Sequence, residues 1–236
     1  MNLRLFCLAL LFIVTGTSTR ADDKSADGSV PVEPLARGGE VLLEDHFERN
    51  DLGEWKSIIP AFAVRDGVLA STQQRSDHGA VGRVYRDMGN VVVDFRFRLT
   101  GSRTFNVVFD DKNHKGSHAG HICRVTFAAN SIRLGDDKEG VMRNDIFEMR
   151  RDANRRADAD KLLIGRGSTA KVQLQQNQWY QATIEVVGDQ MRVCMDGRPL
   201  GYLKSSGIAH PTKTSLHFTV SGPGVEFDDV VIRRAK

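Results

Sequence analysis

The chain has 236 residues, with 33 lysines and arginines against 30 aspartates and glutamates, which gives a net charge of +3 at pH 7. Arg4 and Arg20 lie in the first 21 residues, which hold no acidic residue, so removing these two from the 33 leaves 31 basic residues against 30 acidic ones. A nearly neutral chain with interleaved signs excludes the broad basic surface that binds phosphates, and we expect no nucleic-acid partner.

Residues 1–21 have the pattern of a cleavable signal peptide. A short positive start is followed by an apolar run from Leu5 to Val14 and then by small residues up to Ala21. Ten apolar residues span only ~15 Å as a helix, about half of a bilayer core, so we expect no stable membrane anchor after processing. The sequence predicts cleavage near Ala21 and a secreted or periplasmic protein.

Residues 22–39 are polar, rich in proline and glycine, and without a period, which predicts a flexible lead-in. From Glu40 onward the hydrophobic period is two, as expected of half-buried strands. The clearest apolar sets with this spacing are Val91, Val93, Phe95, Phe97 and Leu99; Phe105, Val107 and Phe109; and Leu216, Phe218 and Val220.

Turn signals separate these strands at regular intervals. The pairs are Asp66-Gly67, Ala129-Asn130, Gly188-Asp189 and Asp196-Gly197. About a dozen strands at a spacing of roughly 8–12 residues are typical of a sandwich. We therefore predict one all-β domain over residues 40–234, built from two antiparallel sheets.

Residues 144–161 break this rhythm because they are dense in charge and contain no glycine. The segment could form a short helix or a solvated surface excursion, and we favour the excursion.

Three patterns in this order resemble the concanavalin A-like lectin and glucanase sandwiches, and most closely the 3-keto-disaccharide hydrolase domain. They are Phe47-x4-Leu52-x2-Trp55 followed by 64–69 (VRDGVL), then 179–197 (WYQATIEVVGDQMRVCMDG), and finally 225–232 (VEFDDVVI). The resemblance covers about residues 40–234. It implies a concanavalin A-like jelly-roll fold and cleavage of glycosidic bonds in 3-keto-disaccharides or related modified sugars.

The chain departs from the family where the chemistry is expected. The family's Asn-Ser-Gly strand ending in Arg reads 105–110 (FNVVFD), so only Asn106 is kept. In the next strand, Ile122 replaces the family's Glu and Arg124 replaces its Gln. The loss of that carboxylate favours an alternative function, a non-catalytic lectin-like or laminin-G-like module that binds polysaccharide or a protein partner.

A second comparison is with the laminarinase-type glycosidases of the same fold, which resemble one another in carrying the motif Glu-x-Asp-x-x-Glu on one strand. Here residues 143–148 (RNDIFE) keep Asp145 and Glu148, but Arg143 replaces the nucleophile. Retaining chemistry needs two facing carboxylates, so this segment does not predict it.

A cluster of imidazoles follows two aspartates between the predicted strands. His114, His118 and His121 come shortly after Asp110 and Asp111. This set could bind a divalent metal, supply a base with a pKa near neutrality, or form a solvated loop. The candidate catalytic residues are Asp110, His118, His121 and Glu148.

The polar sides of the strands form a candidate substrate-binding face. We expect it to carry Asp94, Arg96, Arg98, Asn106, Arg124 and His217 beside Asp110. Trp55, Tyr85 or Trp179 would supply an aromatic platform for a sugar, although Trp179 is predicted to begin a strand and pack inward. A solvent-facing sheet with cross-strand ion pairs explains the same pattern without a ligand.

Only Cys123 and Cys194 follow the leader. Cys123 has the parity of inward-facing Val125, whereas Cys194 has that of Arg192 and Asp196. The two side chains are thus predicted to point to opposite faces, which disfavours a disulfide in spite of the oxidising compartment.

Overall fold

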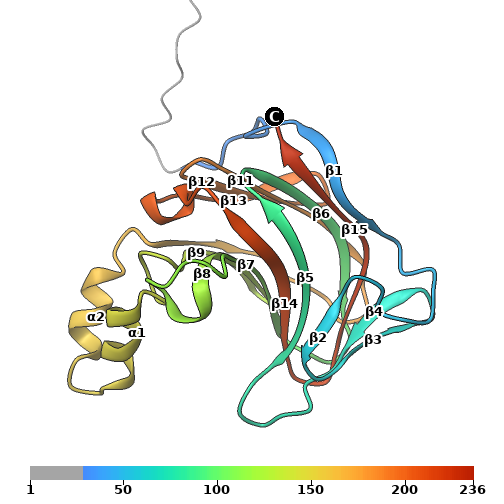
Figure 1. Ribbon diagram of the computed structural model, residues 1–236, viewed down its shortest axis with the longest axis horizontal. Helices are drawn as coiled ribbons and strands as arrows, with labels where there is room; N and C mark the ends of the chain where they lie inside the picture. Colours follow the sequence, from blue (N-terminus) through green and yellow to red (C-terminus); the bar gives the residue numbers. More distant parts are fainter. Residues whose placement is uncertain (1–28) are drawn as a thin grey trace, which may run out of the picture.

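Two antiparallel β-sheets pack face to face over residues 29–236, the part of the chain that the computed structural model describes (Figure 1). The predicted jelly-roll β-sandwich is confirmed. The predicted signal peptide lies outside the described residues.

The first sheet has eight strands. In spatial order they are β13 (Arg198–Lys204), β12 (Gln190–Met195), β11 (Tyr180–Val187), β6 (Val91–Leu99), β15 (Val225–Ala235), β4 (Val68–Ser71) and β3 (Phe62–Arg65), with β1 (Gly38–Asp45) pairing β15. The second sheet has seven strands. Their order is β10 (Gly167–Lys171), β9 (Ser131–Asp136), β8 (His121–Ala128), β7 (Thr104–Asp110), β14 (Lys213–Ser221), β5 (Ala80–Met88) and β2 (Lys56–Ile59).

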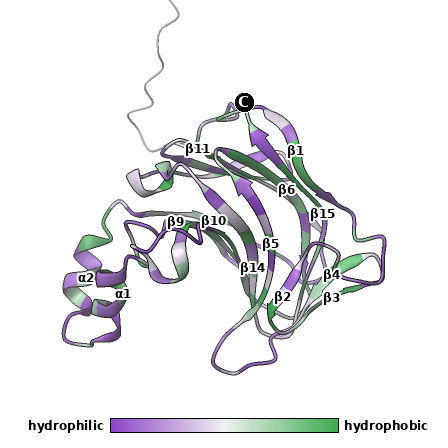
Figure 2. Ribbon diagram, in the orientation of Figure 1, coloured by the Kyte–Doolittle hydropathy of each residue, from purple (hydrophilic) through white to green (hydrophobic). Residues whose placement is uncertain are grey.

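The core lies between the two sheets and is built from the alternating apolar residues. All five residues of the β6 set and all of the β7 and β14 sets are buried, as predicted. Aromatic rings fill the centre, where Phe218 stacks on Trp55 at 5.2 Å and on Phe227 at 4.0 Å between centroids. The strands carry both hydrophobic and hydrophilic residues (Figure 2). Because the apolar ones line the inside of both sheets, the hydrophilic ones are left for the outer faces.

The predicted single polar face is wrong. Asp94, Arg96 and Arg98 lie on β6 in the first sheet, whereas Asn106, Asp110, Arg124 and His217 lie on strands of the second sheet. β6 and β7 are consecutive in the chain, but the connection crosses from one sheet to the other. Each strand turns its polar side away from the core, so the two sets lie on opposite outer faces of the sandwich.

The four predicted turns are confirmed. Each joins two paired strands: β3 to β4, β8 to β9, β11 to β12, and β12 to β13.

The charged segment after β9 forms two short helices, α1 (Asn144–Arg151) and α2 (Arg156–Leu162). The preference for an irregular excursion is therefore corrected. Ile146 and Ala159 are fully buried while most of the charged residues stay exposed, so each helix has one apolar contact point. Figure 1 shows the pair standing beside the end of the second sheet. Two 3₁₀ turns, η1 (His118–Gly120) and η2 (Ser206–Ala209), complete the fold.

The end of the predicted lead-in is held on the first sheet. Arg192 donates to the carbonyl oxygens of Pro31 and Val32 at 2.8 and 2.7 Å, and the Leu35 amide donates to Glu185 at 2.7 Å. Arg192 and Glu185 are themselves a buried ion pair of 2.7 Å. The segment from Pro31 onward thus supplies partners to charges that would otherwise be left short of hydrogen bonds.

Cys123 and Cys194 are both free thiols, the first buried in the second sheet and the second on β12 of the first. Within residues 29–236 no helix is long and apolar enough to cross a membrane.

Candidate functional site

A pocket of about 420 Å³ lies on the outer face of the second sheet. Among the described residues that line it there is no carboxylate. The polar lining consists of imidazoles, guanidinium groups, an amide and a hydroxyl: His78, His118, His121, His217, Arg83, Arg124, Asn106 and Thr219. The pocket is therefore equipped for hydrogen bonding and proton transfer by nitrogen bases, with no acidic side chain at its surface.

Strand register brings these residues together. Antiparallel pairing places the members of one row directly opposite one another, on the same face of neighbouring strands. The row across β5, β14, β7 and β8 is Arg83, His217, Val108 and Arg124, and the adjacent row is Tyr85, Ser215, Asp110 and His121. These strands come from three distant parts of the chain, so only the folded sheet assembles the site.

Asp110 is the buried centre of the cluster. Its two oxygens lie 2.5 Å from His121 Nδ1 and 2.9 Å from His217 Nδ1, and Arg83 Nη2 donates to it at 2.9 Å. Burial alone would raise the pKa of Asp110, but the hydrogen bonds and charges of the two histidines outweigh it and hold the pKa well below the usual 3.8. The carboxylate therefore stays ionised, and it orients the two rings.

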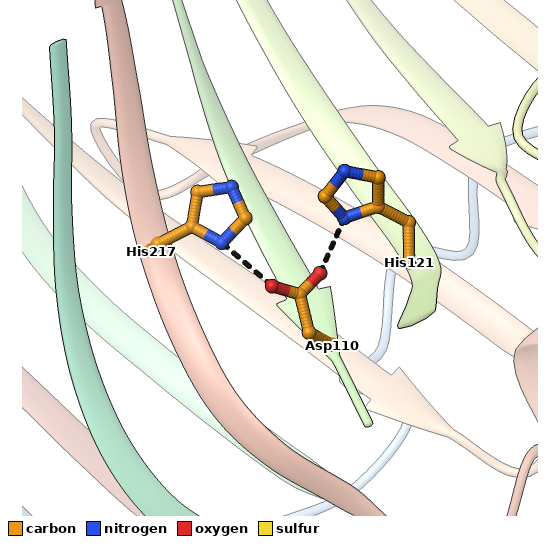
Figure 3. Close-up of side chains that lie close together, drawn as sticks. All are labelled: Asp110, His121 and His217. Atoms are coloured by element: carbon orange, nitrogen blue, oxygen red, sulfur yellow. Dashed lines mark hydrogen bonds and ion pairs between the residues drawn. The ribbon is translucent and has the colours of Figure 1, made fainter. Parts of the chain in front are cut away.

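The two rings present their other nitrogens to the pocket. Because the Asp110 carboxylate only accepts, each Nδ1 carries the proton of its hydrogen bond. Figure 3 shows both Nε2 atoms on the side of the rings away from Asp110. Burial lowers the pKa of His217 below 6.5 even though Asp110 raises it, which favours the neutral ring. Of the described residues, Asp110, His121 and His217 form the group that could hold a metal ion, with one ligand atom from each within 4.8 Å of the others.

Arg124 lies on β8, at the other end of its row from Arg83, and a buried aspartate anchors it. Its Nε donates to Asp137 over 2.6 Å, and Asp137 is fully buried. Neither the Nη1 of Arg124 nor that of Arg83 has a hydrogen-bond partner within residues 29–236. Each guanidinium is thus fixed by one aspartate and keeps a donor for a ligand.

His118 closes the pocket from the loop before β8. Its ring stacks on Phe147 of α1, 4.2 Å between centroids and 11° between planes. Burial and the neighbouring His121 lower the pKa of His118, so the ring is neutral near pH 7. No hydrogen bond holds either ring nitrogen within the described part of the chain.

The backbone between His118 and His121 is in a left-handed conformation. Ala119 has φ of 55° and Gly120 has φ of 75°. A β-carbon on Gly120 would lie 2.3 Å from the carbonyl oxygen of Asp111, so only glycine fits. Strained backbone of this kind is often found at functional sites, and here it sets the direction of both rings.

Six of the ten candidate site residues converge on this pocket: Asn106, Asp110, His118, His121, Arg124 and His217. The other four do not. Asp94 accepts hydrogen bonds from Thr183 and Arg233 on the first sheet. Glu148 lies on exposed turns of α1, beside Arg151 at 3.5 Å.

Arg96 and Arg98 lie over the ring of Trp179 on the outer face of the first sheet, 4.8 and 5.0 Å from its centroid. Trp179 precedes β11 and is only partly buried, so the prediction that it packs inward is wrong. Trp55 is buried in the core, whereas Tyr85 is 47% exposed and shares the face of Arg83. Of the three aromatic candidates, Tyr85 is the one next to the pocket.

Arg83, His78, Phe147 and Asp137 belong to the site or support it, and sequence reasoning missed them. The only local signal was period-two alternation around Arg83, which places it outward with Tyr85. Nothing in the sequence indicates that β5 lies beside β14 or that α1 reaches His118.

No family model and no curated protein matches this sequence. Solved structures share the fold at low identity. A protein of unknown function with a galectin-like fold from Bacillus subtilis is 10% identical over 85% of this chain and 99% of its own, with a TM-score of 0.58. The laminarinase from Rhodothermus marinus is 14% identical over 86% of this chain and 100% of its own, with a TM-score of 0.57. The carbohydrate-binding module CBM66 from Bacillus subtilis is 11% identical over 76% of this chain and 95% of its own, with a TM-score of 0.51.

Proposed function

We propose that this protein is a carbohydrate-active enzyme that cleaves the glycosidic bond of a sugar carrying a ketone at C3. The observation that carries the proposal is a pocket that residues 29–236 line with four imidazoles and two guanidinium groups but no carboxylate. Ordinary glycosidases place two carboxyl groups on either side of the bond, one of them able to donate a proton. Asp110 lies behind the imidazoles and stays ionised, so it fills neither role.

A ketone at C3 changes which chemistry is needed. It makes the hydrogen on C2 acidic, and a neutral imidazole is a suitable base for such a proton. The C2–H electron pair moves into the enolate and then forms the C1–C2 double bond as the C1–O bond breaks. The departing oxygen takes the proton that the base removed from C2, and addition of water across the double bond, with its OH on C1 and its H on C2, completes the hydrolysis.

The geometry assigns a role to each pocket residue. His118 is the base, because its ring is neutral near pH 7 and its nitrogens have no partner in the described chain. Arg83 and Arg124 donate to the enolate or hydroxyl oxygens, where a fixed charge stabilises the developing negative oxygen. His121 and His217, locked by Asp110, direct their Nε2 atoms toward the sugar.

The second candidate function is binding without catalysis. It is favoured by the fold likeness to a carbohydrate-binding module over 95% of that module's chain, and by exposed Tyr85 beside the pocket. In this case the same residues would recognise a sugar or a protein partner by hydrogen bonds alone. The leader pattern in residues 1–21 supports action outside the cytoplasm in either case.

The two candidates are separated by incubating the purified protein with 3-keto-glucosides and with the unoxidised disaccharides. We expect release of free sugar from the keto substrates only, and a fall of roughly 100-fold or more for His118→Ala. His46→Ala is the matched control, because His46 is exposed outside the pocket. Saturable sugar binding without turnover of any substrate would establish the binding module instead.

A further inference from the structure

Two imidazoles that line the pocket meet one buried carboxylate behind them. Asp110 lies in the centre and accepts from the Nδ1 atoms of His121 and His217. The Nε2 atoms point away from it on the same side, as Figure 3 shows. An Asp110 oxygen and one ring nitrogen of each histidine lie within 4.8 Å of one another.

This order is the one that protein metal sites use. A histidine that binds a metal through one nitrogen almost always donates the other N–H to a carboxylate or carbonyl, which fixes the tautomer and strengthens the ligand. Here a single buried aspartate does this for two rings, and Arg83 lies 2.9 Å from the same carboxylate.

We propose that His121 and His217 bind a divalent transition-metal ion through Nε2, with Asp110 as the residue that positions both rings. Imidazole nitrogen selects zinc, cobalt, nickel or copper over magnesium and calcium, which prefer oxygen ligands. Two protein ligands leave the remaining coordination positions open to the pocket, whereas a structural zinc site is closed by four protein ligands.

The open positions face the place where the sugar would lie, so the ligands that complete the shell are water or oxygens of the substrate. Only this last point rests on the proposed function. A ketone and the neighbouring hydroxyl of one sugar ring are suitable oxygen ligands, and a bound ion would polarise the ketone. Metal binding itself needs neither substrate nor turnover.

The test is titration of the chelator-treated full chain with Zn²⁺ by calorimetry and with Co²⁺ by visible absorption. We expect one saturable site, with affinity at least ~10-fold weaker in His121→Ala and in His217→Ala, and ~10–100-fold weaker in Asp110→Asn. His46→Ala is the matched control, because His46 also lies between carboxylates, Glu44 and Asp229, but outside the pocket. Its affinity is expected to be unchanged.

Buried His217 could be needed for folding, so the wild-type protein supplies a second measurement. X-ray absorption of the Zn²⁺-loaded chain is expected to show two imidazole nitrogens in the first shell. Absence of saturable binding, a shell without two imidazoles, or equal loss in His46→Ala would overturn the metal site. If the protein binds no metal and its turnover survives chelation, the metal site is overturned and the proposed function stands. If the protein binds Zn²⁺ at this site but turns over no substrate, the metal site stands and the proposed function is overturned.

Discussion

Arg124 donates a hydrogen bond from Nε to the fully buried carboxylate of Asp137 over 2.6 Å, beneath the pocket. Burial raises the pKa of Asp137 above its usual 3.8, and the charge of Arg124 offsets this only in part. Asp137 Oδ1 and Arg124 Nη2 are buried and have no hydrogen-bond partner among residues 29–236. Such a pair holds the guanidinium in place, and either partner alone would be an uncompensated buried charge.

Asp137→Asn is therefore expected to destabilise the fold by about 3 kcal/mol, because it leaves Arg124 without a counter-charge. The measurement is the free energy of unfolding in urea. Asp145→Asn is the matched control, since Asp145 pairs with Arg143 at 2.7 Å on the surface and should have little effect. Equal effects of the two changes would contradict the assignment.

The buried His217 predicts how stability depends on pH. Its pKa lies below 6.5 in the folded state because it is buried, although Asp110 opposes this and Arg83 and His121 add to it. Below pH 6.5 the unfolded chain binds a proton that the folded chain does not, so stability falls as the pH drops. The slope contributed by one such group is at most about 1.4 kcal/mol per pH unit. Urea unfolding between pH 7 and 5 should show a shallower slope for His217→Gln than for the wild type.

Gly120 and Gly165 have the same φ of 75° but different surroundings. A β-carbon at Gly120 would lie 2.3 Å from the Asp111 carbonyl oxygen, whereas nothing lies within 4 Å of one at Gly165. Gly165→Ala should cost only the backbone strain of about 1–2 kcal/mol. Gly120→Ala should cost more and should also disturb His118 and His121. Thermal unfolding together with sugar-binding titration would check this, and similar losses at both positions would speak against a close-packed turn.

The stack of Phe147 on His118 predicts a role for α1 in the reaction. Phe147→Ala removes the ring that holds the imidazole, so we expect a fall in kcat of roughly 10-fold with a small change in KM. Phe147→Trp keeps a flat ring and serves as the control. Steady-state kinetics on a 3-keto-glucoside make the comparison. An unchanged kcat in Phe147→Ala would show that the helix does not position the base.

The contacts of Pro31, Val32 and Leu35 with Arg192 and Glu185 predict that this segment stabilises the first sheet. Deletion of residues 1–35 removes three hydrogen bonds to buried charged groups. Compared with deletion of residues 1–28, it should lower the free energy of unfolding by a further ~3 kcal/mol or more. Each hydrogen bond to a charged group contributes about 1.5–3 kcal/mol, part of which new contacts with water replace. Chemical unfolding of the two shortened chains measures the difference, and equal stabilities would refute it.

The sequence determined the elements that depend on local spacing. Alternation at Val91–Leu99 and around Phe105 and Leu216 predicted which side of each strand is buried, because side chains point to opposite faces at every step. The four turn pairs predicted hairpins for the same local reason. The sequence also placed Asp110, His118 and His121 in one candidate group, because they lie close together in the chain.

The tertiary structure decided what depends on strand order. The alternation of apolar and polar residues predicts that Arg96 and Asn106 face away from the core, but it does not predict that their strands belong to different sheets. The same information was missing for Arg83 on β5 and His217 on β14, which meet Asp110 only because their strands pair. The helix that brings Phe147 to His118 was missed because its stability comes from burial of Ile146, a tertiary contact, rather than from its charged sequence.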